Sequence, residues 1–217
     1  MRANLHQAST PFRLGVDLDG VLYPFGEVFA RNVEREYGLD PFSLLPPSSW
    51  DFFENEWGFP KAEFHVMYGA GVVSGDLFSA GLADTEVLAA LSRLASLGVE
   101  LHVLTSRALS EPVRGTSAAT LNEMITSHTH TWLTMTGLPL HSVNVVHGSK
   151  LGPARSLGLD ALLDDSPHHL AEVASACTTV AWDQPWNRAA PSVHRVSTAD
   201  ELVNTVQQLR GLVDVCG

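Results

Sequence analysis

Cysteine and basic residues are both scarce in this sequence. The 217 residues include two cysteines, Cys177 and Cys216, which are too few for a disulfide framework or a cysteine zinc site. Lys and Arg number 13 against 24 Asp and Glu, and the formal net charge is -11. A protein that holds long nucleic acid needs a basic face, so we expect no such partner. A mononucleotide is not excluded, because a single phosphate needs only a few donors.

Long apolar runs are also missing. No stretch reaches the length needed to span a membrane, and the N-terminal segment 1–11 lacks the apolar centre of a secretion signal. With 45% hydrophobic and 17% charged residues, the composition is that of a globular protein with a real core. We therefore expect a soluble, cytoplasmic protein with no membrane partner, built as one large domain or as a core domain with an insertion.

The most informative stretch is 12–22, FRLGVDLDGVL, in which an apolar run leads into two carboxylates. Side chains alternate along a strand, so Asp17 and Asp19 would point the same way at its carboxyl end. Gly20 would let the chain turn sharply just beyond them. Two carboxylates this close repel one another, and a divalent cation such as Mg²⁺ is the simplest remedy. An Asp/Gly-rich turn after a strand is the alternative for this stretch taken alone.

The pattern after residue 22 is that of an insertion. Helices are expected at 27–37 and 60–68, separated by a stretch rich in Pro and aromatic residues that cannot be one continuous helix. Gly69, Gly71 and Gly75 are expected to break the structure that follows. We interpret 23–82 as a small, mainly helical cap, with 1–22 and 83–217 as the core. The alternative is that 23–82 is one irregular part of a single core.

Helices and strands alternate from residue 84 onward. Helices are expected at 85–97, with Asp84 as N-cap, and at 117–136, 153–157, 167–176 and 198–209. Strands are expected at 99–104, 143–146, 160–163 and 178–182. Together with the first strand, this alternation predicts an α/β fold with a five-stranded, parallel, doubly wound sheet and helices on both faces.

Reactive side chains follow four of the five predicted strands, and a parallel sheet brings such strand ends to one edge. They are Asp17 with Asp19, Thr105 with Ser106, Lys150, and Asp164 with Asp165. Together these groups could perform phosphoryl transfer. One carboxylate would attack phosphorus, a second would protonate the leaving oxygen, and hydroxyl, amide and ammonium groups would bind the phosphate. Carboxylates from two places in the chain would hold Mg²⁺.

These motifs, DLDGV, LTSR, Lys150 and LLDDSP, resemble in order and spacing the four motifs of the haloacid dehalogenase superfamily of phosphatases. The resemblance covers residues 12–176 and includes a cap inserted as in the type-one members of that superfamily. It implies a Rossmann-like sheet of strand order 3-2-1-4-5. The cap and the later segment DQPWNR most resemble the 5'(3')-deoxyribonucleotidase branch. Part of the segment 132–140 also resembles the phosphatase half of polynucleotide kinase-phosphatases.

The resemblance implies a role for each motif residue. Asp17 would be the nucleophile and Asp19 the general acid/base, while Lys150 would screen Asp17 and the phosphate. The Mg²⁺ ligands would be Asp17, Asp19 through its backbone carbonyl, and Asp164, with Asp165 in support. The phosphate-binding group would comprise Leu18, Thr105, Ser106, Arg107 and Lys150. Members that dehalogenate lack the second acid of the first motif, so Asp19 favours a phosphatase.

Two interpretations remain open for several other residues near these motifs. Arg107 could contact the substrate or pair with an acid. The loop residues Asp183, Asn187 and Arg188 could line the site or form a turn held by Asx hydrogen bonds. His169, beside His168 at a helix start, is expected to face solvent, and no zinc site is expected. The aromatic residues Phe25, Trp50 and Phe53 could stack on a base, although Trp50, Phe52 and Phe53 fit the core of the cap as well.

We therefore expect a Mg²⁺-dependent phosphomonoester hydrolase that works through an aspartyl-phosphate on Asp17. Its partner would be a small phosphorylated substrate, with a nucleotide favoured. The alternatives are a sugar phosphatase, a nucleic-acid 3'-phosphatase and a catalytically silent phosphate- or nucleotide-binding protein. A phospho-accepting signalling module also uses Asp, Thr and Lys around Mg²⁺, but the order of the motifs and the cap disfavour it. The oligomeric state is open, with a homodimer among the alternatives.

Overall fold

A computed structural model describes residues 10–190 and 194–216, with side chains described up to residue 211. The described part of the chain does not include the N-terminal segment 1–9, where no secretion signal is expected, or the side chain of Cys216. Within the described part of the chain, no helix is both long enough and apolar enough to cross a membrane.

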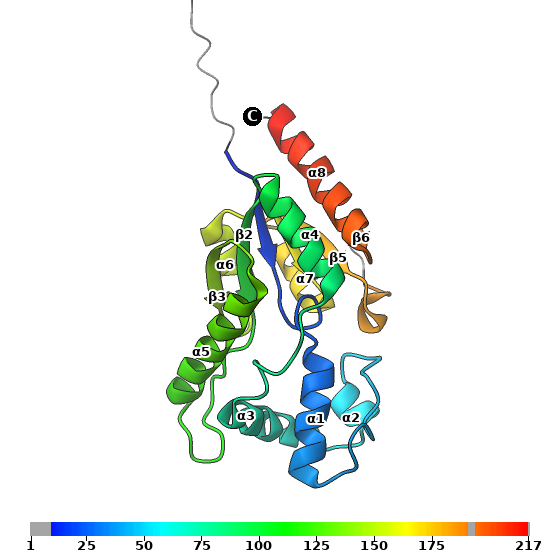
Figure 1. Ribbon diagram of the computed structural model, residues 1–217, viewed down its shortest axis with the longest axis vertical. Coiled ribbons are helices and arrows are strands. Elements are labelled where there is room, and N and C mark those ends of the chain that lie inside the picture. Colours follow the sequence, from blue (N-terminus) through cyan, green and yellow to red (C-terminus); the bar gives the residue numbers. More distant parts are fainter. Residues whose placement is uncertain (1–9, 191–193, 217) are drawn as a thin grey trace, which may run out of the picture.

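The core alternates strands and helices (Figure 1). Its strands are β1 (Arg13–Val16), β2 (Glu100–Thr105), β3 (Leu140–Val145), β4 (Ala161–Asp164), β5 (Thr178–Trp182) and β6 (His194–Val196). Its helices are α4 (Thr85–Ser96), α5 (Ala118–Thr136), α6 (Leu151–Leu157), α7 (Pro167–Val173) and α8 (Ala199–Cys216). The segment between β1 and α4 contains α1 (Phe25–Tyr37), α2 (Phe52–Asn55), the short 3-10 helix η1 (Lys61–Glu63) and α3 (Phe64–Ser74). A second 3-10 helix, η2 (Pro185–Asn187), follows β5.

The sheet is parallel throughout, in the order β3-β2-β1-β4-β5-β6. The predicted order 3-2-1-4-5 is confirmed, but the prediction of five strands is wrong, because β6 adds a sixth strand beside β5. Strand β6 has three residues, of which only Val196 is buried. A strand this short, with two polar residues, has neither the apolar run nor the alternation that identifies a strand in a sequence.

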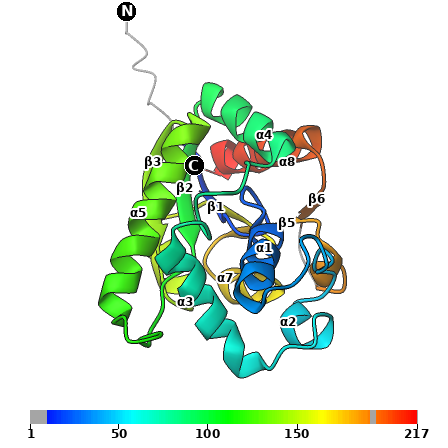
Figure 2. The ribbon, with the colours of Figure 1, turned by 60° about the horizontal axis from the view of Figure 1, so that its bottom comes forward.

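Helices cover both faces of the sheet. In Figure 1, α4, α5 and α8 lie in front of the sheet, while α6 and α7 lie behind it. Figure 2 shows α4 beside α8 from a second direction. The apolar residues of the central strands β1 and β2 are almost completely buried, among them Leu14, Val16, Leu101 and Val103. Such continuous burial is typical of parallel strands that are covered on both faces.

Two predicted helix starts are confirmed by their capping contacts. The side chain of Asp84 accepts hydrogen bonds from the backbone nitrogens of Glu86 and Val87, at 2.9 and 3.0 Å. Pro167 occupies the first turn of α7, directly after the capping residue Ser166. The predicted bounds differ more at β3, which begins at residue 140 rather than 143, and at α8, which continues beyond residue 209.

Helix α3 runs through two glycines that were expected to interrupt it, and only Gly75 ends it, in the left-handed conformation. A Cβ atom on Gly69 would lie 2.5 Å from the side chain of Val113, and one on Gly71 would lie 2.8 Å from that of Asn32. These glycines therefore allow α3 to approach its neighbours closely. Tertiary packing outweighs the low helix propensity of glycine here.

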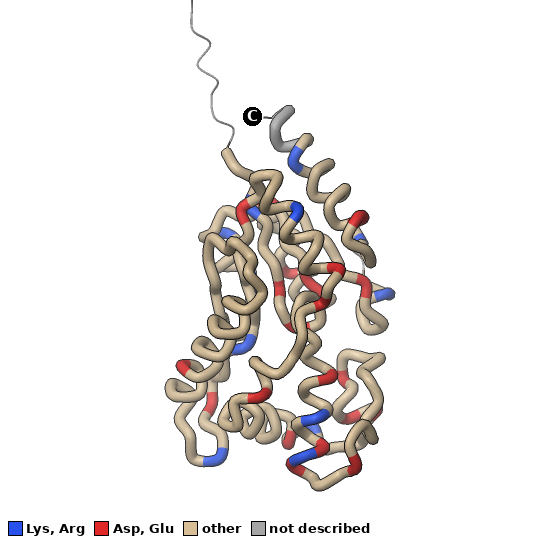
Figure 3. Tube along the Cα trace, in the orientation of Figure 1, with Lys and Arg blue, Asp and Glu red and all other residues tan. Residues whose placement is uncertain are grey.

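The helices α1, α2 and α3 form a body beyond the carboxyl ends of the strands (Figure 1). The fully buried ring of Phe29 lies at its centre, within 6.4 Å, between ring centroids, of Phe25, Phe52, Phe53, Trp57 and Phe64. The hydroxyl of Tyr68 ties this body to the core by donating to the backbone oxygen of Arg107, at 2.6 Å. Acidic positions, red in Figure 3, lie where the central strands end. The division into a core and a cap of residues 23–82 stays a prediction.

Candidate active site

Three buried carboxylates meet at the carboxyl ends of the central strands. Asp17 directly follows β1, whereas Asp164 ends β4 and Asp165 follows it. One oxygen of each carboxylate lies within 4.8 Å of the others, and each residue is at most 5% exposed. Strands β1 and β4 are neighbours, which brings these acids together across nearly 150 residues of sequence. We call these three residues the acid cluster.

Lys150, at the N-terminal end of α6, has a completely buried ammonium between two of the acids. Its Nζ lies 2.8 Å from Asp17 Oδ1 and 2.7 Å from Asp164 Oδ2. Burial opposes the charge of the lysine, but the two carboxylates raise the pKa of Lys150 above its ordinary value. Burial also opposes ionisation of Asp164, but Lys150 holds the pKa of that carboxyl below its ordinary value. Lys150 is therefore an ammonium at the centre of the site.

The acid cluster carries more negative charge than the surrounding side chains neutralise. When all three carboxylates are ionised they face one ammonium, which leaves two negative charges uncompensated. Burial, opposed by Lys150, raises the pKa of Asp17 to about 6. Burial together with the charges of Asp164 and Asp17 raises the pKa of Asp165 well above its ordinary value. A divalent cation would balance these charges, and a donor set made of carboxylate oxygens suits Mg²⁺.

Asp19 lines the cavity above the acid cluster and is held by Arg107. Arg107 Nε donates to Asp19 Oδ2 at 2.9 Å, and Nη2 donates to Oδ1 at 2.6 Å. Its Nη1 donates to Thr129 Oγ1 at 2.9 Å. The guanidinium carbon lies 4.1 and 4.9 Å from the ring centroids of Phe78 and Tyr23. The structure therefore shows Arg107 as the buried partner of an acid, and Arg107 itself is absent from the cavity lining.

The predicted phosphate-binding residues lie in different environments. The Thr105 hydroxyl, at the end of β2, is buried and has no hydrogen-bond partner among the described residues, so a ligand oxygen would satisfy it. Ser106 lines the cavity, and its hydroxyl donates to the backbone oxygen of Gly148 at 3.0 Å. The side chain of Leu18 is fully buried in the core, which leaves only its backbone beside the acids.

A cavity of about 390 Å³ opens above the acids, between the core and the helical body. Asp17, Asp19 and Asp165 are among its lining residues. Six Phe, Tyr and Trp side chains also line it: Phe25, Phe52, Phe64 and Tyr68 from the helical body, Trp50 from the loop before α2, and Trp186 from η2. Phe53 is buried within the helical body instead. The cavity lining thus combines carboxylates with aromatic rings.

His169 lines the cavity, whereas the sequence analysis expected it to face solvent; this expectation is wrong. Its side chain is only 14% exposed, and Nδ1 lies 3.6 Å from Asp164 Oδ2. The reason is the place of α7, which begins with Pro167 directly after the two acids of β4, so that its first turn borders the site. His169 follows the LLDDSP motif closely in the sequence, and this proximity could have indicated its place beside the acids.

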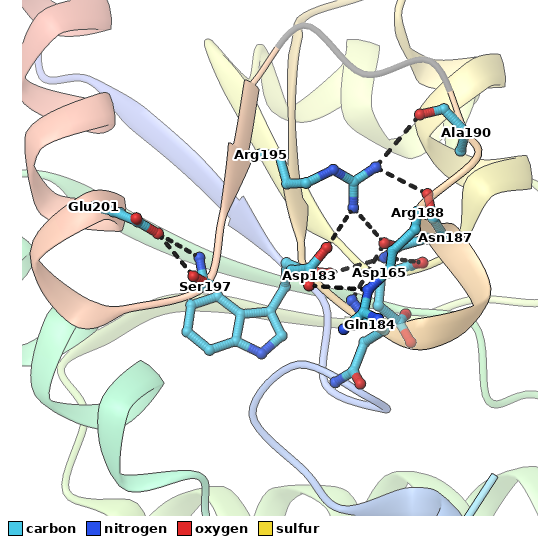
Figure 4. A network of polar contacts seen from close by, with 10 residues as sticks. Asp165, Asp183, Gln184, Asn187, Arg188, Ala190, Arg195, Ser197 and Glu201 are labelled. Atoms are coloured by element: carbon cyan, nitrogen blue, oxygen red, sulfur yellow. Dashed lines mark hydrogen bonds and ion pairs between the residues drawn. The ribbon is translucent and has the colours of Figure 1, made fainter. Parts of the chain in front are cut away.

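Trp186 is a further residue of the site that sequence reasoning missed. It lines the cavity, and its Nε1 donates to Asp165 Oδ2 at 3.1 Å. Its neighbours Asp183, Asn187 and Arg188 are absent from the cavity lining, and Figure 4 shows them in a network of polar contacts. The structure thus favours the turn interpretation for these three residues.

Comparison with known proteins supports the fold. No family model and no curated protein matches the chain. A structure described as a "predicted phosphatase" from Clostridium acetobutylicum is similar, with a TM-score of 0.60 at 15% identity over 92% of this chain and 100% of that one. A haloacid dehalogenase-like hydrolase from Streptococcus pneumoniae gives 0.57 at 12% identity, over 90% and 98% of the two chains.

A third structure, a hydrolase of haloacid dehalogenase subfamily IA from Geobacter sulfurreducens, gives a TM-score of 0.51 at 15% identity, over 90% of this chain and 96% of that one. These likenesses show that the chain has the haloacid dehalogenase-type fold, as its motifs predict. The chemistry that this chain performs on that fold has to be argued from its own residues.

Proposed function

We propose that this protein is a Mg²⁺-dependent phosphomonoester hydrolase that works through an aspartyl-phosphate on Asp17. The observation that carries the proposal is the acid cluster, in which Asp17 and Asp164 share the ammonium of Lys150. Its excess negative charge calls for a divalent cation, and Asp17 lines a cavity that gives a substrate access to it. The fold supports the proposal because the similar structures include hydrolases.

In the first step, an oxygen of Asp17 attacks phosphorus, and the bond to the leaving oxygen breaks as Asp19 donates a proton to that oxygen. The unpartnered Thr105 hydroxyl donates to a phosphoryl oxygen, while Lys150 screens the charge of Asp17. Bound Mg²⁺ would neutralise charge between the phosphate and the acids. In the second step, Asp19 accepts a proton from the water that attacks phosphorus. Inorganic phosphate leaves and Asp17 is restored.

A nucleotide is the substrate class that the cavity fits best. The acids and a bound cation would receive the phosphate, and the aromatic side chains of the lining would receive a flat ring, because bases stack readily on aromatic side chains. A sugar phosphate offers no such ring. The resemblance of the cap and of the segment DQPWNR to the 5'(3')-deoxyribonucleotidase branch supports a 5'-deoxyribonucleotide within this class.

Release of phosphate from a panel of substrates tests this function. The panel contains 5'- and 3'-mononucleotides of both sugars and several sugar phosphates, each with Mg²⁺ and with a chelator. We expect turnover of 5'-deoxynucleotides that depends on Mg²⁺ and is lost with the chelator. Turnover of sugar phosphates alone would contradict the nucleotide substrate but keep the chemistry. Turnover that survives the chelator would contradict the metal requirement.

Trp50→Ala should raise KM for nucleotides by about tenfold with little change in kcat, because one base–aromatic stack is worth about 1 to 3 kcal/mol. Trp50 is 52% exposed and lines the cavity, so its removal should leave the fold intact. Phe42→Ala is the matched control, because Phe42 is 81% exposed and does not line the cavity. Steady-state kinetics of the wild type and both variants measure KM and kcat. An equal rise in KM for a sugar phosphate, which has no flat ring to stack, would count against stacking of a base.

Arg107→Lys should lower kcat for nucleotides by about 100-fold, within the range that general acid–base catalysis contributes. A lysine cannot reproduce the forked contact that orients the Asp19 carboxylate. The loss should be much smaller with p-nitrophenyl phosphate, whose leaving group hardly needs a proton. This ratio separates positioning of Asp19 from a general loss of structure, because a damaged fold would slow both substrates alike.

A further inference from the structure

The loop of residues 183–190, between β5 and β6, is anchored by one arginine of the edge strand. Arg195 Nη1 donates to Asp183 Oδ1 at 2.9 Å and to Asn187 Oδ1 at 2.5 Å. Its Nη2 donates to the backbone oxygens of Asn187 and Ala190, at 2.8 and 3.4 Å (Figure 4). The guanidinium therefore binds the beginning, the middle and the end of the described loop.

Asn187 connects this anchor to the acid cluster. The residue is fully buried, and its Oδ1 accepts from Arg195 and from the backbone nitrogen of Gln184. Because these donors occupy the oxygen, the amide nitrogen must face the other way. It donates to the backbone oxygens of Asp165 and Trp182, both at 2.8 Å. The orientation of the Asn187 amide is thus set by Arg195 and transmitted to the backbone of Asp165.

The side chain of Asp165 is held by the same loop. Trp186 Nε1 donates to Asp165 Oδ2 at 3.1 Å. On the other side is Gly20, whose φ of +77° favours glycine; a Cβ atom there would lie 2.0 Å from Asp165 Oδ2 and 3.3 Å from the Trp186 ring. Gln184 Nε2 donates to the backbone oxygen of Gly20 at 2.7 Å, which draws that turn toward the loop. Asp165 is therefore enclosed between Gly20 and Trp186.

Asp165 needs such support because its neighbours repel it. It is 4% exposed beside two further carboxylates, and the ammonium of Lys150 contacts those two acids. Without fixed contacts, its carboxylate would gain by turning away from the cluster. We propose that Arg195, Asn187 and Trp186 are positioning residues that hold Asp165 in place to bind the divalent cation. This inference rests on the proposed function, which places the cation at the acid cluster.

The affinity of the purified 217-residue chain for Mg²⁺, measured by calorimetry without substrate, tests this inference. Arg195→Met should raise the Kd for Mg²⁺ by about 10- to 100-fold, the effect typical of residues that orient metal ligands. Trp186→Phe keeps most of the ring but lacks the donor, and should raise Kd by about tenfold. Arg188→Met is the matched control. Arg188 is 68% exposed and contacts the loop acid Asp183 at 3.4 Å, so Kd should stay unchanged.

Thermal unfolding in the presence of a chelator shows whether each variant is folded. A variant that is folded but binds Mg²⁺ more weakly supports a positioning role rather than a purely structural one. An unchanged Kd in folded Arg195→Met and Trp186→Phe would overturn the inference and leave the proposed hydrolase standing. If Arg195→Met does not fold, the result for Trp186→Phe decides. A wild-type protein that binds no Mg²⁺ would overturn the inference and the metal requirement of the proposed function together.

Discussion

Replacing Asp17 with Asn should abolish release of phosphate, lowering kcat by at least about 10⁴-fold, as expected when the nucleophile of a covalent mechanism is lost. The amide has nearly the shape of the carboxylate, but it cannot form the acyl phosphate. Asp17 Oδ1 lies 2.8 Å from the Lys150 ammonium, so the substitution also removes one carboxylate partner of that ammonium. Single-turnover measurements with the best substrate of the panel would detect even a small residual rate. A rate within tenfold of wild type would contradict the role of Asp17.

The same variant should be at least as stable as wild type when no cation is bound. Burial raises the pKa of Asp17 from 3.8 to about 6. Between pH 3.8 and about 6, the folded state therefore keeps a proton that the unfolded chain has released. The contribution of Asp17 to the free energy of unfolding therefore falls as pH rises from 3.8 to about 6, and above that range Asp17 destabilises the folded state to its full extent. Asn carries no such cost. Thermal unfolding in a chelator at pH 7.5 should give an equal or higher Tm, which separates lost chemistry from lost structure.

Lys150→Met should strongly destabilise the protein, by about 3 to 5 kcal/mol at pH 8, because removing one partner of a buried ion pair leaves uncompensated charge. The acids of the cluster would then face one another without an internal cation, since both contacts of the ammonium are to Asp17 and Asp164. For a chain of this size, the expected fall in Tm is about 10 °C. Thermal unfolding in a chelator measures it directly.

The pH dependence of this loss follows from its cause. Without Lys150, the carboxylates of the folded variant bind protons more readily than those of the unfolded chain, so the penalty should shrink as pH falls from 8 to 5. Lys61→Met is the matched control. Lys61 is 76% exposed and 3.9 Å from its acidic partner, and its removal should change stability by less than about 0.5 kcal/mol. A loss for Lys150→Met that is equally small, or independent of pH, would contradict this account of the site.

The sequence predicts the centre of the fold and of the candidate site because a parallel sheet has simple rules. The apolar run before Asp17 and the run before Asp164 indicate buried strands, and parallel strands place their carboxyl ends at one edge. The structure brings Asp17, Lys150, Asp164 and Asp165 together as this rule requires. The strand order follows from the family resemblance of the motifs, and the structure confirms it for five strands.

The features that the sequence did not indicate depend on contacts between distant or short segments. Strand β6 is too short and too polar to be read from its pattern, yet it supplies Arg195, which anchors the loop beside the site. Arg107 allowed two interpretations because nothing in a local pattern states which acid lies opposite it. The glycines of α3 look like helix breakers until the close neighbours Val113 and Asn32 are in view. Tertiary packing decides each of these cases.

Mapping the covalent intermediate tests the central claim most directly. The protein would be mixed with Mg²⁺ and a radiolabelled 5'-deoxynucleotide that carries the label in its phosphate, quenched in acid during turnover, and digested for peptide analysis. We expect the label on the peptide that contains Asp17, removable by hydroxylamine and absent from Asp17→Asn protein. Label on a different residue, or equal labelling of wild-type and Asp17→Asn protein during turnover, would contradict the proposed mechanism.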